Sequence, residues 1–520
     1  MSCRLRSNAR SALTVLAVFA AAACGRRTIS PAPESRPVAS SWPPQAVRAD
    51  ARASDEDLQQ AVLNELHKDK NINEASVLVT ATGGSVVLTG KVDNPLSRER
   101  ATRIAQVVRG VRSVDNRIDV AAVPRADSDI AADVRKALKG QAATGKMPIS
   151  VQVKDAVVTL SGTVSSRQEQ RLAERVAEGV RGVRLEHDDL LTGLNSVRSA
   201  AEIQNDVTSR LAWDALVEHD PITVSVKARQ VYLSGTTGSA AECARAISDA
   251  WVDGVKGVEA TELLVDTVQR PDANVRAAEP RADRDIARAI LDAAHYEPRL
   301  HGASFTPSVT DSVVTLNGSV DTLSARMAAA ALARSTVGVR AVKNQLAVTP
   351  PLPLEDHVQQ KQISDALSFD PLLIAGEITP TVKNGRVTLS GNVDTYFERA
   401  EALDDVSGIG NVTAIDDKLT VRKPAQSYVY SPWIDPFTPH VDTWYVTSLR
   451  ASLSDSEITK RIRENFKWSA FVQPQDVGVR VERGEATLTG RVSSYRERQA
   501  VIDGALEAGA ISVDDELSVG

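Results

Sequence analysis

The stretch Val86-Val87-Leu88-Thr89-Gly90 decides the fold of this chain, because its ending recurs five more times in the 520 residues. Each copy places leucine, a small polar residue and glycine at the end of an apolar run, and a second glycine follows at a nearly constant distance. The copies lie at 88–90, 160–162, 233–235, 316–318, 389–391 and 488–490, and the second glycines are Gly110, Gly182, Gly257, Gly338, Gly410 and Gly509. Self-similarity of this kind is typical of repeat architectures, so we predict a tandem array of one small module.

The residues around the first copy predict the order of elements inside a module. Leu58, Val62 and Leu66 lie four residues apart and form one apolar stripe of a helix. Gly83-Gly84 then separates two apolar runs, as expected for a tight hairpin. The helical period returns, and an alternating run at 114–120 closes the unit. We therefore predict an α+β fold of six αββαβ modules, each a three-stranded sheet with both helices on one face.

These patterns divide the chain into an N-terminal leader, six modules and one insertion. We expect a signal peptide at 1–23, a proline-rich disordered tether at 24–54, modules at 55–120, 127–192, 199–267, 283–349, 355–422 and 454–520, and an insertion at 423–453. The second helix of the fifth module, at 396–406, is expected to be shortened. Units of about 65 residues are near the lower limit for one core without disulfides or metal, so neighbouring modules are expected to pack together.

The N-terminus predicts the cellular compartment. Arginines among the first ten residues precede an apolar run at 12–23 that is too short to span a bilayer comfortably. The run ends at Cys24 and resembles a lipobox, which implies a diacylglycerol on Cys24, although Ala21 stands where such signals more often carry leucine. Gly25 after the cysteine implies sorting to the outer membrane of a Gram-negative cell, facing the periplasm. The alternative is an ordinary secretory signal whose cleavage site abuts a cysteine.

Cysteine usage leaves the modules to rely on packed cores. Cys3 would leave with the signal peptide and Cys24 would carry lipid, so Cys243 is the one thiol of the mature chain. A single thiol forms no internal disulfide. Its alanine-rich helical surroundings favour the role of a buried small hydrophobe over that of a reactive thiol.

The element order and the closing motif resemble the BON domain. The second strand ends in V-x-L-[ST]-G, and G-V-x-x-V-x-N-x-L-x-V closes the unit at 110–120 and at 338–348, with Asn116 and Asn344 in place. Asp188 and Thr261 depart from this asparagine in the second and third modules. The resemblance implies a role in the cell envelope. It also implies kinship with osmotic-stress proteins, with outer-membrane lipoproteins that bind anionic phospholipid and with accessory domains of secretins and channels, and it implies no enzyme activity.

The residues themselves point to no catalytic or metal chemistry. The sequence holds no G-x-S-x-G, no P-loop and no H-E-x-x-H. His295 and His301 are considered as a metal pair and set aside, since no ligand spacing repeats across modules. Acidic pairs at 188–189, 416–417 and 514–515 are assigned to strand-entry turns, where aspartate bonds the local backbone. We expect no catalytic residue, no metal and no cofactor.

Charge suggests a membrane surface as the partner. The net charge of −6 argues against nucleic acid. The second helices of the first and fourth modules are basic, and each arginine near an anionic surface contributes about 1 kcal/mol. The candidate lipid contacts are Arg98, Arg100, Arg103, Arg109, Arg112, Arg326 and Arg334. The alternative is that these side chains form an ordinary solvated helix surface.

The insertion at 423–453 concentrates aromatic residues between prolines. These residues are Tyr428, Tyr430, Trp433, Phe437, Trp444 and Tyr445. Such an arm docks either on the adjacent modules or on a partner or membrane interface, because tryptophan and tyrosine suit a surface with one apolar and one wet side. The sequence thus predicts a lipid-binding envelope lipoprotein that supports osmotic tolerance. The alternative is an interaction scaffold or accessory subunit of an outer-membrane transport or secretion assembly. A small-ion sensor ranks last, because no ligand cluster supports it.

Overall fold

The computed structural model describes residues 53–69, 72, 77–192, 198–218, 220–266, 281–351, 354–374, 376–422, 453–493, 495–510 and 512–519. The predicted signal peptide, Cys24 and the six aromatic residues of the insertion lie outside these residues.

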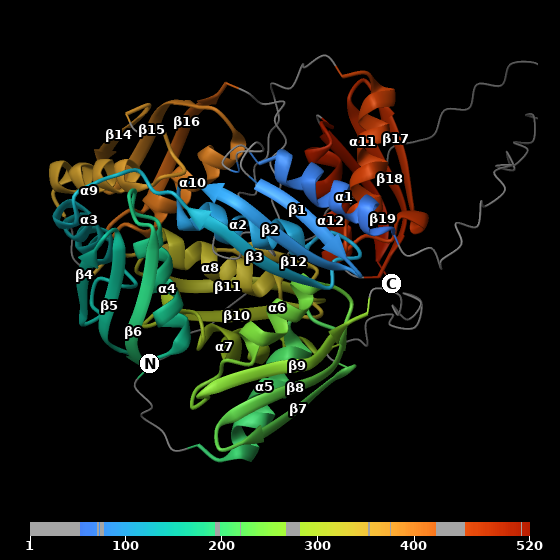
Figure 1. The fold of residues 1–520 in the computed structure, drawn as a ribbon, viewed down its shortest axis with the longest axis horizontal. Coiled ribbons are helices and arrows are strands. Elements are labelled where there is room, and N and C mark those ends of the chain that lie inside the picture. Colours follow the sequence, from blue (N-terminus) through green and yellow to red (C-terminus); the bar gives the residue numbers. More distant parts are fainter. Residues whose placement is uncertain are drawn as a thin grey trace, which may run out of the picture. The chain divides into compact units, whose positions relative to one another are not determined.

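Six modules repeat the order helix, strand, strand, helix, strand, which confirms the predicted fold class (Figure 1). The first helices are α1 (Asp55–His67), α3 (Asp127–Gly140), α5 (Ala200–Trp213), α7 (Asp283–Ala294), α9 (Asp356–Phe369) and α11 (Asp455–Trp468). The second helices are α2 (Pro95–Gln106), α4 (Arg167–Glu178), α6 (Ala240–Asp249), α8 (Leu323–Arg334), α10 (Tyr396–Gly408) and α12 (Tyr495–Glu507). Short 3-10 turns, η3 (Pro298–Leu300) and η4 (Pro474–Asp476), precede the hairpins of the fourth and sixth modules.

Each sheet has the second strand in its middle, paired antiparallel with the first strand and parallel with the third. The first strands are β1 (Val77–Thr82), β4 (Ile149–Lys154), β7 (Ile222–Lys227), β10 (Ser304–Thr310), β14 (Ile378–Lys383) and β17 (Val477–Glu482). The middle strands are β2 (Ser85–Val92), β5 (Val157–Val164), β8 (Gln230–Thr237), β11 (Val313–Val320), β15 (Arg386–Val393) and β18 (Glu485–Val492). The third strands are β3 (Ser113–Val120), β6 (Leu185–Thr192), β9 (Gly257–Val265), β12 (Ala341–Asn344) with β13 (Ala347–Val348), β16 (Ala414–Val421) and β19 (Ser512–Val519).

An aspartate at the start of the first helix holds the hairpin turn. Gly83 and Gly84 have φ of 58° and 84°, the left-handed pair that a two-residue hairpin turn needs. Both of their N–H groups donate to the carboxylate of Asp55, at 2.9 and 3.3 Å. Aspartate also suits the positive end of the helix dipole. The carboxylates of Asp127, Asp283, Asp356 and Asp455 also accept bonds from backbone N–H groups of the hairpin turns. These bonds support left-handed turns at residues that are not glycine, such as Asp155 and Ala156.

The glycine of the recurring triplet is required by a close approach of backbones. Gly162 has a φ of 140°, and a Cβ there would overlap the carbonyl oxygen of Pro148 at the start of the hairpin. The same overlap would occur at Gly235, Gly391 and Gly490, with the carbonyl oxygens of Pro221, Glu377 and Asp476. The glycine therefore recurs because the hairpin leaves no room for a Cβ at this position.

The second recurring position is a left-handed residue between the second helix and the third strand. Gly110 fills it in the first module, with a φ of 95°. In the third module the residue is Gly254, at a φ of 89°, and the recurring Gly257 is not the equivalent residue, because it already begins β9. In the fifth module it is Asn411, at a φ of 67°, and the recurring Gly410 directly precedes it. Asparagine tolerates this conformation through local hydrogen bonds.

The fifth module corrects the prediction of a shortened second helix. Its second helix, α10, has 13 residues against 12 in α2, so it is not shortened.

Each module buries its own hydrophobic core between the helices and one face of its sheet. In the first module Val62 of α1, Leu88 of β2 and Ile104 of α2 are fully buried in one cluster. The opposite face of the sheet is solvated, as Leu78 on β1 shows with 64% of its surface exposed. Five further clusters of the same kind lie in the other modules. Burial of apolar surface is the main force that holds such small units together.

Candidate functional site

The basic second helix of the first module begins at a built cap. Asn94 accepts the backbone N–H of Ser97 at 2.7 Å, and Pro95 occupies the first turn of α2. This start turns Arg100 inward, where it is only 5% exposed and forms an ion pair with Asp69. Its guanidinium also lies 4.1 Å from the ring centroid of Phe397 in the fifth module. Arg100 therefore has partners inside the protein.

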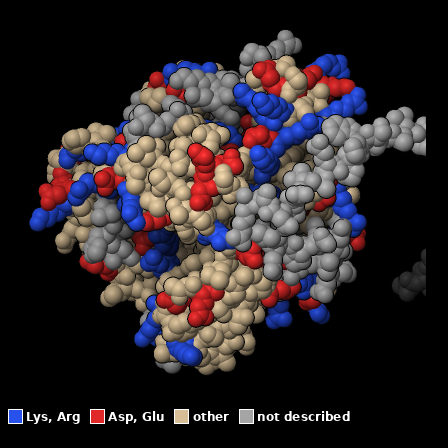
Figure 2. Space-filling model, turned by 45° about the vertical axis from the view of Figure 1, so that its right-hand side comes forward, with Lys and Arg blue, Asp and Glu red and all other residues tan. Residues whose placement is uncertain are grey.

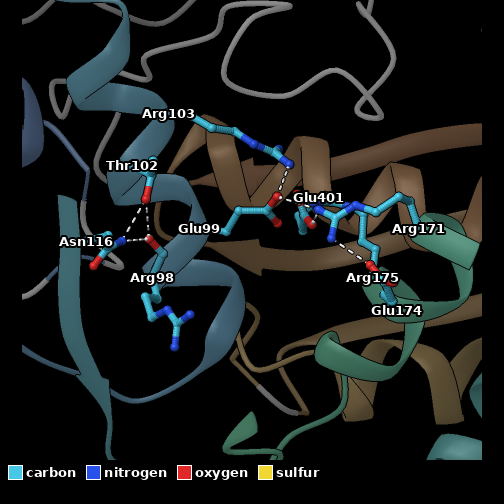
Figure 3. A network of polar contacts seen from close by, with 9 residues as sticks. All are labelled: Arg98, Glu99, Thr102, Arg103, Asn116, Arg171, Glu174, Arg175 and Glu401. Carbon is cyan, nitrogen blue, oxygen red and sulfur yellow. Dashed lines mark hydrogen bonds and ion pairs between the residues drawn. The ribbon is translucent and has the colours of Figure 1, made fainter. Parts of the chain in front are cut away.

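An ion network begins on the other face of α2 and crosses to the second module (Figure 3). Glu99 pairs with Arg103 one turn later at 2.5 Å. The same carboxylate oxygen lies 3.2 Å from Nη2 of Arg171 on α4. Arg171 in turn pairs with Glu174 at 2.6 Å. Opposite charges thus alternate along the line where the two helices approach each other.

The network continues into the fifth module, where Arg175 of α4 lies 3.7 Å from Glu401 of α10. Burial raises the pKa of Glu99, but the charges of Arg103, Arg175 and Arg171 outweigh it and hold that pKa below its usual range. Burial, helped by the negative charge of Glu99, raises the pKa of Glu178 to about 7. We interpret the network as a set of ion pairs that holds these modules together. The carboxyl group of Glu178 beside it has a pKa near neutrality.

Asn116, the asparagine of the closing motif, joins the third strand to the second helix (Figure 3). Its Nδ2 donates to the carbonyl oxygen of Arg98 and to Oγ1 of Thr102, both at 2.7 Å. Its Oδ1 accepts the N–H of Ile118 at 2.9 Å. Asn344 repeats the first of these bonds, to the carbonyl oxygen of Arg326 at 2.9 Å.

Two of the acidic pairs occupy the same register as this asparagine. Asp417 and Asp515 lie inside β16 and β19, so the prediction that they form strand-entry turns was wrong. Their carboxylates accept from Nε of Arg399 and of Arg498, at 2.5 and 2.7 Å. Their oxygens also accept the backbone N–H two residues later. Both carboxylates therefore join the third strand to the second helix of their module, as Asn116 does in the first module.

The two remaining departures from the motif lie in β6 and β9. The backbone of Asp188 lies in β6, opposite Leu160, and its side chain is outside the described residues. Thr261 lies in β9 beside a register shift between Tyr232 and Ser234.

The other predicted lipid contacts are also half-buried or buried. Arg109 donates from Nη2 and Nε to the carbonyl oxygen of Ser469 in the sixth module, at 2.8 and 3.2 Å. The backbone N–H of Arg112 donates to Gly84 at the hairpin turn. Arg326 and Arg334 lie on α8, and Arg98 on α2. The contact of these side chains with lipid stays a prediction.

Modules dock in a nested order that the sequence analysis missed. Isolated β-bridges join Val108 to Ser469, Gln141 to Ile409 and Asp214 to Thr336. The first module therefore docks on the sixth, the second on the fifth and the third on the fourth. Each bridge joins the end of a first helix in one module to the end of a second helix in the other.

An aromatic residue marks this docking in all three pairs. Trp213, Phe369 and Trp468 each end a first helix. Their carbonyl oxygens accept the N–H groups of Val337, Arg181 and Arg109, at 2.9, 2.7 and 2.8 Å. Each donor directly precedes the left-handed glycine of its module: Gly338, Gly182 and Gly110. An aromatic residue at the end of the first helix is the signal that could have marked one member of each pair.

His295 and His301, considered above as a metal pair, each lie beside a carboxylate, and Cys243 lies against a core. His295 lies 2.8 Å from Asp253, and His301 lies 3.0 Å from Glu169. Among the residues that the structure describes, no group of three or more potential ligands could hold a metal ion. Cys243 is half-buried against the core of the third module, and burial raises the pKa of its thiol, in agreement with the predicted role of a small hydrophobe.

Within the described part of the chain, no helix is both long enough and apolar enough to cross a bilayer.

Comparisons with known proteins follow the same module borders. A family model for the BON domain matches residues 54–122, 126–190, 199–266, 282–350, 355–423 and 454–520. Osmotically-inducible protein Y of Escherichia coli (strain K12) is 34% identical over 129 residues, which cover 24% of this chain. The chain spans 64% of the length of that relative.

Two solved structures also resemble the chain. A solved structure of CdsD, a structural protein of the Type III secretion system of Chlamydia trachomatis, shows 14% identity and a TM-score of 0.12, and the match covers 44% of this chain and 99% of the solved chain. The C-terminal domain of CdsD shows 15% identity and a TM-score of 0.11, covering 40% and 98%. TM-scores this low carry no argument about function. The family matches cover well over half of the sequence in six copies, and the chain therefore belongs to the BON domain family.

Proposed function

We propose that this protein is a non-enzymatic lipoprotein of the bacterial cell envelope that binds phospholipid membrane surfaces and supports the envelope under osmotic stress. Six BON modules in one chain carry the proposal. The E. coli relative, whose name records osmotic induction, supports the stress role. The leader ending at Cys24 supports the lipid anchor, and hence the outer membrane and the periplasm as the location.

Exposed cations on α11 offer the best-placed membrane contact among the described helices. Lys460, Arg461, Arg463 and Lys467 are exposed, whereas Ile462 of the same helix is fully buried in the core of the sixth module. Each exposed cation near an anionic surface contributes about 1 kcal/mol. Figure 2 shows positive and negative residues interspersed over one face of the molecule, so basic stretches of this kind are local. Several modules with weak local contacts would gain affinity together when they engage one membrane.

Vesicle flotation tests the membrane contact. The chain from residue 25 onward is mixed with vesicles of phosphatidylglycerol and phosphatidylcholine, or of phosphatidylcholine alone, at low and high salt. We expect flotation with the anionic vesicles at low salt and its loss at high salt, because exposed charges are screened over about 10 Å at 0.1 M salt. Absence of flotation with anionic vesicles at low salt would contradict the proposal.

A charge-matched pair of variants locates the contact. One variant replaces Lys460, Arg461, Arg463 and Lys467 by glutamate. The control replaces four exposed lysines of other modules by glutamate: Lys91, Lys139, Lys154 and Lys256. We expect the first variant to lose flotation and the control to keep most of it. Equal losses in both would assign the binding to net charge instead of α11.

A second candidate function, a protein-interaction scaffold for an envelope assembly, is favoured by the docking mode itself. The modules already bind one another through the carbonyl groups of Trp213, Phe369 and Trp468. The aromatic arm at 423–453 would add a further contact. Crosslinking in cells with and without residues 428–445 tests this candidate: specific protein adducts that disappear with the arm would support it, and an unchanged adduct pattern would count against it.

A further inference from the structure

His301 connects the fourth module to the second through both of its ring nitrogens. Its Nδ1 lies 3.0 Å from Oε1 of Glu169 on α4. Its Nε2 lies 3.2 Å from the carbonyl oxygen of His295 in its own module. The side chain of His301 is 39% exposed and that of Glu169 is 11% exposed, so water reaches the pair from one side.

Both ring nitrogens face oxygen atoms that accept hydrogen bonds. A carbonyl oxygen accepts only, and the other oxygen of Glu169 already accepts the N–H of Ser165 at 2.6 Å, as a carboxylate does. Neutral imidazole carries one N–H, so it would leave a nitrogen lone pair against an oxygen. The imidazolium form donates from both nitrogens and satisfies the arrangement.

The charged groups around His301 favour the same protonation state. The hydrogen bond to Glu169 raises the pKa of His301, burial opposes this, and the nearby charge of Glu297 adds to it. The same bond lowers the pKa of Glu169. Arg299 faces Glu297 and pairs with it at 2.8 Å, and His295 pairs with Asp253 of the third module at 2.8 Å.

The first turn of α4 is a junction of three modules. Next to Glu169, the guanidinium of Arg167 lies 5.6 Å from the ring centroid of Trp251 in the third module. Gln168 donates to the carbonyl oxygen of the same tryptophan. In both of these contacts the partner from the third module is the uncharged Trp251. A change in the charge of His301 therefore acts on the contact between Glu169 and the fourth module.

We propose that His301 and Glu169 form a proton-controlled clasp that holds the fourth module on the second in mildly acidic solution and releases it when His301 loses its proton. The sign follows from the two pKa shifts. The raised pKa of His301 makes its contribution complete below the ordinary histidine pKa of 6.5, and the contribution is lost as pH rises through the raised value. The lowered pKa of Glu169 makes its contribution complete above 4.5. The clasp is therefore strongest between pH 4.5 and 6.5.

Hydrogen exchange of the full chain at pH 5.5 and 8.0 tests the clasp, after correction for the intrinsic exchange rate at each pH. The informative peptides cover 165–170 and 298–303. For wild type we expect protection of both peptides to fall several-fold at pH 8.0. For His301→Gln we expect the low protection at both pH values. His301→Arg stays charged, so we expect it to keep the protection at pH 8.0.

His357→Gln is the matched control, since His357 faces Glu355 at 3.3 Å within the fifth module and both are largely exposed. We expect it to behave as wild type in both peptides. Equal protection of wild type at the two pH values would overturn the clasp. A pH response that survives in both His301 variants would overturn it as well, and that reading does not depend on the stability of either variant.

Discussion

The guanidinium of Arg109 donates two hydrogen bonds to the carbonyl oxygen of Ser469, which lies 360 residues further along the chain. The backbone N–H of Arg109 also donates to the carbonyl oxygen of Trp468 at 2.8 Å. These bonds join the first module to the last one. Of the three module pairs, this one joins the modules that lie furthest apart in the sequence. In each pair, the end of a first helix in one module contacts the end of a second helix in the other.

Arg109→Ala is expected to loosen the sixth module from the first. Hydrogen bonds to charged groups contribute about 1.5–3 kcal/mol each when buried, and this site is half-buried, so we expect local opening at 468–472 to become easier by about 1–2 kcal/mol. Hydrogen exchange of peptides over these residues measures it. Arg117→Ala is the control, because Arg117 is 66% exposed and pairs with Asp115 on its own strand. Equal exchange in both variants would refute the docking role of Arg109.

Gly162→Ala is expected to destabilise the second module by about 2 kcal/mol or more, because the new methyl group overlaps the carbonyl oxygen of Pro148. Gly376→Ala is the matched control: Gly376 has a φ of 84°, but open space surrounds it. The control should cost about 1 kcal/mol, the penalty of a left-handed residue alone. Exchange of amides in β5 and β15, measured in the full chain, separates the two effects. Similar costs would show that conformation, and not overlap, explains the repeated glycine.

Asn116→Ala is expected to destabilise the first module by about 1–3 kcal/mol, since the carbonyl oxygen of Arg98 and the N–H of Ile118 lose their partner. Asn116→Asp should cost much less. Arg98 stands where Arg399 and Arg498 stand in the fifth and sixth modules, and both of those arginines bond an aspartate. Exchange of amides in β3 compares the two variants, and an aspartate variant as damaging as the alanine variant would contradict this reading.

Glu178→Gln is expected to stabilise the protein above neutral pH. The folded pKa of about 7 exceeds the ordinary 4.5, so the folded state binds more protons than the unfolded state between these values. Stability is therefore lost as pH rises from 4.5 to 7, and the loss stays complete above 7. We expect the variant to raise the melting temperature at pH 8 by about 2–4 °C and to leave it unchanged at pH 4. Glu516→Gln, at an exposed position of β19, is the control and should do neither.

The fold of each module could be predicted because its rules act over short distances. Each of its sequence signals reflects a local constraint. The stripe of Leu58 and Val62 reflects a helix, the turn at Gly83 a hairpin, and the triplet ending at Gly90 a close approach of backbones. The sequence pattern was less informative where more than one residue type can satisfy the same constraint. Asn411 fills a left-handed position that glycine fills in the first module, so the recurring Gly410 does not mark this position in the fifth module.

The contacts between modules could not be predicted in the same way. Docking relies largely on backbone N–H and carbonyl groups, which nearly every residue carries, so the aromatic ends of three helices are its main trace in the sequence. Arg100 was predicted to face lipid because its charge suggests a surface, but Phe397, almost three hundred residues later, covers it. Only the tertiary arrangement brings Asp69 and Phe397 to that side chain.

Crosslinking of the full chain at lysine, followed by mass spectrometry, tests the nested pairing most directly. Lys68 donates to Asn465, which lies on α11 between Lys460 and Lys467. Lys136 and Lys361 both lie within 4 Å of Asp365. We expect abundant links from Lys68 to the lysines of α11 and from Lys136 to Lys361. Links confined to modules that are adjacent in sequence, with none between the first and sixth or the second and fifth, would contradict it.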